Sequence, residues 1–144
     1  MKALYITLMQ RINEQVPEIK TIDFEMGQLD ALTNDLRPEV LFPCCLIDID
    51  YINCEDGSDG KQLVTARTTL KLAFEQQLPT DSLSAEAKHS SALAVFDVIE
   101  KVHTALQGFS TEMFSSFSRN SMTPDRRFAG IRVIDVVYET TFEE

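Results

Sequence analysis

Apolar and polar residues alternate almost without a break along residues 61–75, which read KQLVTARTTLKLAFE. Every second position carries a mostly apolar set, which consists of Val64, Ala66, Thr68, Leu70, Leu72 and Phe74. A period of two places this set on one face of a β-sheet and the more polar residues between them on the other. The stretch is well beyond the usual ~5–6 residues of a strand. We therefore expect a long, bent strand whose outer end leaves the body of the sheet.

Two segments instead repeat their apolar residues at steps of three and four, the period of an amphipathic helix. The first covers residues 1–16, with a stripe made of Tyr5, Leu8, Met9, Ile12 and Val16. The second covers residues 84–107, with a stripe made of Ala92, Val95, Phe96, Ile99, Val102 and Leu106. Pro17 predicts the end of the first helix and Gly108 the end of the second, whose start either Ser82 or Ser84 caps.

Strand-like patterns also occur at residues 19–28, 41–52, 114–122 and 131–142. In the last of these the apolar residues change from odd-numbered to even-numbered positions along the strand. We therefore expect a β-bulge near residues 134–136. A loop or a single helical turn is expected at residues 29–39, and a loop at residues 76–83. Pro124, Asp125 and the two arginines after them predict a turn.

The sequence NCEDGSDG at residues 53–60 is the clearest turn signal in the chain. Because it lies between two predicted strands, residues 41–75 are expected to form a β-hairpin, with Glu55, Asp56 and Asp59 at its tip. An EF-hand calcium loop centred on Gly60 would place Gly57 and Ala66 at ligand positions, and neither supplies a side-chain oxygen. A solvated tip is favoured over a metal site.

The predicted order is therefore helix, strand, strand, strand, helix, strand, strand, within a single domain at residues 1–144. Short turns between consecutive strands favour antiparallel pairing. Two helices with one apolar stripe each predict an α+β fold, in which both helices cover one face of a mainly antiparallel sheet. The residues expected in the core are Val64, Leu70, Leu72, Val95, Phe96, Ile99 and Val102.

Composition narrows the function classes only slightly. The net charge is −10, which argues against a nucleic-acid-binding module because such a module needs a basic face. No apolar run is long enough to span a bilayer, and the first residues lack a signal-peptide pattern, so a cytoplasmic location is expected. The three cysteines have no metal-site spacing and are expected to be free thiols, at least one of them buried.

No local motif predicts catalysis. The serines at positions 115, 116, 118 and 121 lie in no nucleophile elbow, and His89 and His103 are too far apart along a helix to share a metal ion. We therefore expect no catalytic residue, no cofactor and no metal. An enzyme or a small-molecule-binding α+β domain stays open as an alternative, because sites built from distant residues leave no local motif.

Three segments together resemble the tail terminator (tail completion) proteins of long-tailed bacteriophages and prophages. They are the opening helix closed by VPEIK, the proline-led strand LFPCCLIDID, and the closing strand GIRVIDVVYETTF. The resemblance spans most of the chain as a pattern and assigns no functional residue. It implies a homo-oligomeric ring, usually a hexamer, that ends tail-tube polymerisation and forms the surface to which the head joins.

The partners that this resemblance implies are further copies of the chain, the tail tube protein and a head-completion protein, without a membrane or specific nucleic-acid binding. Its location would be the cytoplasm during assembly and then the virion tail. Another head–tail joining or tube-initiating protein is an alternative.

The long hairpin also predicts where subunits meet. Fifteen residues extend about 50 Å at ~3.3 Å per residue, which is more than two helices of a domain this size can cover. Exposed strands are templates for association, so we expect a subunit contact along the hairpin. The residues placed near this contact are Asp48, Asp50, Thr65, Arg67, Thr69 and Lys71. A twisted hairpin wrapped over its own domain is the alternative.

Overall fold

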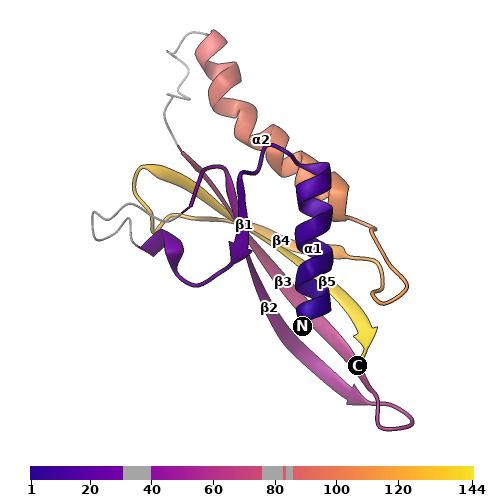
Figure 1. Ribbon diagram of the computed structural model, residues 1–144. Coiled ribbons are helices and arrows are strands. Elements are labelled where there is room, and N and C mark those ends of the chain that lie inside the picture. Colours follow the sequence, from indigo (N-terminus) through magenta and orange to yellow (C-terminus); the bar gives the residue numbers. More distant parts are fainter. Residues whose placement is uncertain (31–39, 76–82, 84–85) are drawn as a thin grey trace.

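The computed structural model describes residues 1–30, 40–75, 83 and 86–144, and the backbone alone for residues 87–92 (Figure 1). Its elements are α1 (Lys2–Gln15), β1 (Thr21–Phe24), β2 (Cys44–Asp56), β3 (Gln62–Glu75), α2 (Glu86–Leu106), β4 (Ser118–Asp125) and β5 (Ile131–Glu143). The predicted order and the α+β class are confirmed. The predicted caps Ser82 and Ser84, and most of the predicted loops at 29–39 and 76–83, lie outside the described residues.

The strands form one five-stranded sheet in the order β1-β2-β3-β5-β4. Three of the four pairings are antiparallel, as expected, but β1 runs parallel to β2. This agrees with the mainly antiparallel sheet that was predicted, since residues 25–43, between β1 and β2, are many more than the short turns that favour antiparallel pairing. The last strand, β5, lies between β3 and β4.

The predicted hairpin at residues 41–75 is confirmed. β2 and β3 pair from Cys44 opposite Ala73 to Asp56 opposite Gln62, with one irregularity at Ile52. All three cysteines lie on β2 and are free thiols, as expected. Cys44 and Cys45 are buried, whereas Cys54 is exposed near the end of the hairpin.

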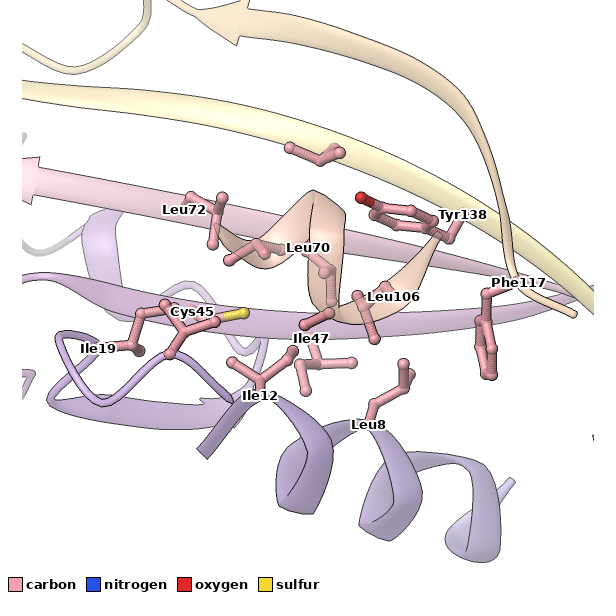
Figure 2. Packing of buried hydrophobic residues seen from close by; sticks show 14 of the residues in the cluster. Leu8, Ile12, Ile19, Cys45, Ile47, Leu70, Leu72, Leu106, Phe117 and Tyr138 are labelled. Atoms are coloured by element: carbon pink, nitrogen blue, oxygen red, sulfur yellow. The ribbon is translucent and has the colours of Figure 1, made fainter. Parts of the chain in front are cut away.

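Both helices pack against the same face of the sheet, as predicted (Figure 2). Leu8 and Ile12 of α1 and Leu106 of α2 meet the sheet residues in a single apolar cluster. The sheet contributes to it, among others, Cys45, Ile47, Leu70, Leu72 and Tyr138. Since these side chains alternate along each strand, the period-two pattern in the sequence marks the buried face correctly.

Five of the seven residues predicted for the core are fully buried, namely Val64, Leu70, Leu72, Ile99 and Val102. Val95 is half-buried against the cluster. Phe96 is 42% exposed, so its assignment to the core is wrong. The first half of α2 extends beyond the edge of the sheet (Figure 1), and there the Phe96 ring lies under the Arg132 guanidinium, 4.8 Å from its carbon.

A second, smaller cluster covers one end of the opposite face of the sheet. It consists of Leu29, Cys44, Leu46, Ala73, Phe128, Ile131 and Val133. This cluster explains why the bulge predicted at residues 134–136 is wrong: β5 pairs with β3 in continuous register, and its first residues are buried on both faces.

The bulges lie elsewhere, at Ile52 in β2 and at Asn120 in β4. The strand predicted at 114–122 runs instead from Ser118 to Asp125. Pro124 therefore belongs to a strand rather than to a turn, and it is tolerated there because β4 is an edge strand of the sheet.

Candidate assembly surface

The side of the sheet that faces away from the helices is polar along most of its length. Alternate residues of the strands point to it, because their neighbours are buried under the helices. We call this surface the open face; its residues are Asp48, Asp50, Asn53 and Glu55 of β2, Thr65, Arg67, Thr69 and Lys71 of β3, and Asp135, Val137, Glu139 and Thr141 of β5. The structure thus brings together on one surface all six residues predicted near the subunit contact.

Charges on the open face are arranged strand by strand. The bases Arg67 and Lys71 lie on the central strand β3, and acidic residues lie on the strands at either side. Arg67, for example, has Asp50 opposite it on β2 and Glu139 opposite it on β5. Opposite charges in directly facing positions stabilise strand pairing, so the same pattern helps to fix the register of the sheet.

Arg67 is the more accessible of the two bases on β3. Its Nη2 lies 3.2 Å from Oε1 of Glu139, and the two side chains are 43% and 28% exposed. Asn120 of β4 donates a hydrogen bond to the same oxygen. An exposed pair of this kind is worth only about 0–1 kcal/mol. Arg67 and the exposed Asp50 beside it are therefore accessible to a neighbouring subunit.

Lys71 is enclosed much more tightly, with a side chain only 12% exposed. Its Nζ lies 3.0 Å from Oδ1 of Asp135 and 3.4 Å from Oδ2 of Asp125, and Arg127 also binds Asp125 at 2.6 Å. Burial lowers the pKa of Lys71, but the hydrogen bond and charge of Asp135 and the other nearby carboxylates outweigh it and raise that pKa above its ordinary value. Lys71 is thus largely engaged within its own subunit.

Asp125 is the most buried carboxylate of this network, with a side chain 8% exposed. The hydrogen bond from Arg127 holds the pKa of Asp125 well below its usual range, and Lys71 acts in the same direction. Asp125 therefore stays charged at every physiological pH. The network ties the end of β4 to β3 and β5 across the sheet.

An open hollow of about 310 Å³ adjoins this network. It is lined by Glu25, Gly27, Asp30, Asp48, Thr69, Lys71, Arg127 and Phe128. Small-molecule sites are mostly apolar with a few polar groups, whereas acids and bases dominate this lining. The hollow therefore gives no support to the alternative of a small-molecule-binding domain.

The end of the hairpin extends past both helices (Figure 1). Residues 52–63 are all exposed, and they include the predicted tip residues Glu55, Asp56 and Asp59. Glu55 and Asp56 belong to β2, so the turn itself is shorter than predicted and closes with a hydrogen bond from Gly57 N to Lys61 O. Asp59 has a φ of 59°, a left-handed conformation that Asp tolerates in turns.

On the helix-covered side, the phenol of Tyr138 lies 3.2 Å from Nδ1 of His103. Burial raises the pKa of Tyr138 to about 12, and it lowers the pKa of His103, so both groups are neutral at pH 7. The buried phenol can then donate a hydrogen bond to the imidazole nitrogen, so the Tyr138 hydroxyl has a partner inside the core. This arrangement gives the core a satisfied polar contact rather than an acid–base pair. The side chain of His89 lies outside the described part of the chain.

Sequence reasoning missed the partners of the two bases on β3. Glu139 and Asp135 come from β5, and Asp125 comes from β4. One signal was present: in IRVIDVVYETTF, Asp135 and Glu139 share the parity of the residues that face away from the helices. Their pairing with β3 was not visible, because the sequence does not state which strands are neighbours.

The fold and this surface define a class: an α+β protein with an apolar, helix-covered sheet face and an opposite, charged face that continues into a projecting hairpin. Neither any known family model nor any curated protein matches this chain. Within the part of the chain that the structure describes, no helix is long and apolar enough to cross a lipid bilayer.

Proposed function

We propose that this protein is a structural virion component of the tail-terminator type, whose copies assemble as a ring at the end of a phage tail tube. The observation that carries the proposal is the projecting β2–β3 hairpin, whose end is exposed from residue 52 to residue 63 beside a charged sheet face. The outer edge of β2 has no neighbouring strand there among the described residues, and uncovered strand edges are templates for association. A neighbouring copy would cover them in a ring.

In this proposal the ring ends tube polymerisation and offers a surface for the head. Its partners are the tail tube protein on one side and a head-completion protein on the other. The ring would act in the cytoplasm during assembly and then form part of the virion tail. The net charge of −10 suits a ring through which DNA passes, since an acidic lumen does not retain phosphate.

Native mass spectrometry over a series of protein concentrations tests the proposal directly. We expect a closed oligomer of defined stoichiometry that increases with concentration, together with ring-shaped particles in negative-stain electron microscopy. A protein that remains monomeric or dimeric up to its solubility limit would refute the proposal.

A shortened hairpin tests the part played by the projection. Replacing residues 56–62 with a two-residue Asn-Gly turn keeps the register, because Glu55 and Leu63 already face each other, and it removes the tip residues Asp56 and Asp59. We expect the oligomer to be lost while the far-UV circular dichroism spectrum and the cooperative unfolding of the subunit are retained. An unchanged oligomer would show that the projecting hairpin is not the assembly surface.

A further inference from the structure

The sheet has two edges that no strand covers among the described residues. On one side β1 pairs only with Cys44–Ile47, so residues 48–56 of β2 have no neighbour on that edge. On the other side β4 is the last strand, and seven of its eight residues are exposed. Each of these edges presents backbone N–H and C=O groups that can pair with another strand, except at Pro124, which has no N–H.

The two edges carry opposite charge. Residues 48–56 have a net charge of −4, because they contain four acids and no base. The acids are Asp48, Asp50, Glu55 and Asp56. Residues 118–127 have a net charge of +2, because they contain three bases and one acid. The bases are Arg119, Arg126 and Arg127, and the acid is Asp125. Arg127 is paired with Asp125, whereas Arg119 and Arg126 are exposed and make no ion pair within the described residues.

This charge distribution discriminates between the ways in which two copies can meet. Two β2 edges repel each other, and so do two β4 edges, whereas a β4 edge and a β2 edge attract. A contact between two different edges is head-to-tail, and head-to-tail contacts generate rings or filaments rather than twofold dimers.

Strand direction agrees with the same contact. From β2 to β4 the sheet has four strands, β2, β3, β5 and β4, and each runs antiparallel to the next. A second copy in the same orientation therefore presents a β2 that runs antiparallel to β4. The lengths agree as well, because β4 has eight residues and the uncovered part of β2 has nine.

We propose that β4 of one copy pairs antiparallel with residues 48–56 of the next copy's β2, so that the sheet continues across the subunit boundary. The inference rests on the proposed ring and names the two edges that close it. Because β1 covers the first four positions of β2, the neighbour must be displaced along the strands by about four residues, or about 13 Å. Such a stagger is what a sheet needs in order to close on itself.

A cysteine scan tests the pairing, since Cys54 lies on the proposed β2 edge and is the exposed one of the three cysteines. Ser121→Cys, Met122→Cys and Thr123→Cys each add one thiol on β4. Under mild oxidation we expect at least one variant to form a ladder of disulfide-linked oligomers, because a disulfide requires Cα atoms within about 4.4–6.8 Å. Adding Cys54→Ser should abolish that ladder.

Four outcomes would overturn the pairing. A cross-link that survives Cys54→Ser would indicate β4–β4 contacts, and Cys54–Cys54 dimers as the main product of the wild type would indicate β2–β2 contacts. No cross-link in any variant, although the ring forms, would reject edge pairing and leave the proposed function standing. A wild type that never assembles would reject both.

Charge reversal provides a second test that does not depend on register. Arg119→Glu with Arg126→Glu should raise the concentration needed for assembly by roughly tenfold or more at low salt, and less at high salt. The matched control is Lys20→Glu with Lys101→Glu, which also changes the net charge from −10 to −14 but lies outside residues 48–56 and 118–127.

Adding Asp50→Arg and Glu55→Arg to the β4 variant, Arg119→Glu with Arg126→Glu, should restore assembly. Equal effects of the β4 variant and the control, or no rescue, would contradict the charge-matched contact.

Discussion

Lys71 and Arg67 provide a matched pair of cations, since both point from β3 to the open face four residues apart. They differ in burial: the side chain of Lys71 is 12% exposed and that of Arg67 is 43% exposed. We predict that Lys71→Met destabilises the subunit considerably more than Arg67→Met does. Methionine fills a similar space without the charge, so the comparison isolates the ion pairs.

The magnitude follows from the partners that each substitution leaves behind. Removing one member of a fully buried ion pair costs about 3–5 kcal/mol. Here Asp125 keeps Arg127, and Asp135 is already 29% exposed, so we reduce the expected loss to about 1–3 kcal/mol. Arg67→Met should cost less than about 1 kcal/mol, because its pair with Glu139 is partly exposed to water.

Urea titrations followed by circular dichroism, at a concentration where the protein is monomeric, measure both losses. Adding Asp135→Asn to Lys71→Met should recover part of the loss, since it removes a carboxylate left without its cation. Equal losses for the two single variants, or a loss for Lys71→Met below about 0.5 kcal/mol, would refute the assignment of a buried network.

The same network makes the stability of the folded protein depend on pH. The pKa of Asp125 is lowered in the folded protein, so its contribution is complete above its ordinary pKa of about 3.9 and is lost as pH falls further. The pKa of Lys71 is raised, so its contribution is complete below about 10.4 and is lost as pH rises through the higher folded value. The stability difference between wild type and Lys71→Met should therefore be constant near neutral pH and shrink at both extremes.

Two further predictions use core positions. Leu70→Ala should cost about 2–5 kcal/mol because Leu70 is fully buried, whereas Phe96→Ala should cost about 1 kcal/mol because its ring is 42% exposed; urea titration of both variants checks the contrast. A thiol reagent should modify Cys54 at once in the native protein but reach Cys44 and Cys45 only on unfolding, since both are buried and burial raises the pKa of Cys44 to about 12. Rapid modification of all three thiols without urea would contradict the burial of β2.

The strands and helices followed from periodicity because burial on one face imposes it. The set from Val64 to Phe74 is buried on the helix-covered face, as predicted. The same reasoning wrongly placed Phe96 in the core. An apolar stripe shows which side of a helix is apolar, but it does not show how far along the helix axis the sheet extends. The bulge prediction for β5 was wrong for a related reason. The strand is buried on both faces at its start, so Ile131 and Val133 do not follow the alternation of apolar and polar positions seen further along it.

The open face was predicted only in part. Asp48, Asp50, Thr65, Arg67, Thr69 and Lys71 were placed together correctly, since they belong to one hairpin and the turn at residues 57–61 fixes its register. Their partners on β5 and β4 depend on which strands become neighbours, and no local pattern encodes that choice. The strand β4 was recognised only weakly, because SRNSMTPD has almost no apolar residue to alternate.

The central position of β5 has a consequence for how this protein folds during synthesis. β5 is the last element along the chain, yet it pairs with β3 on one side and β4 on the other. Until residues 131–143 leave the ribosome, β3 has an unpaired edge, β4 has no partner, and Val136 and Tyr138 are missing from the core. Because these contacts join distant parts of the chain, the sheet can close only after translation of its final strand, and the nascent hairpin stays open to unwanted strand pairing until then.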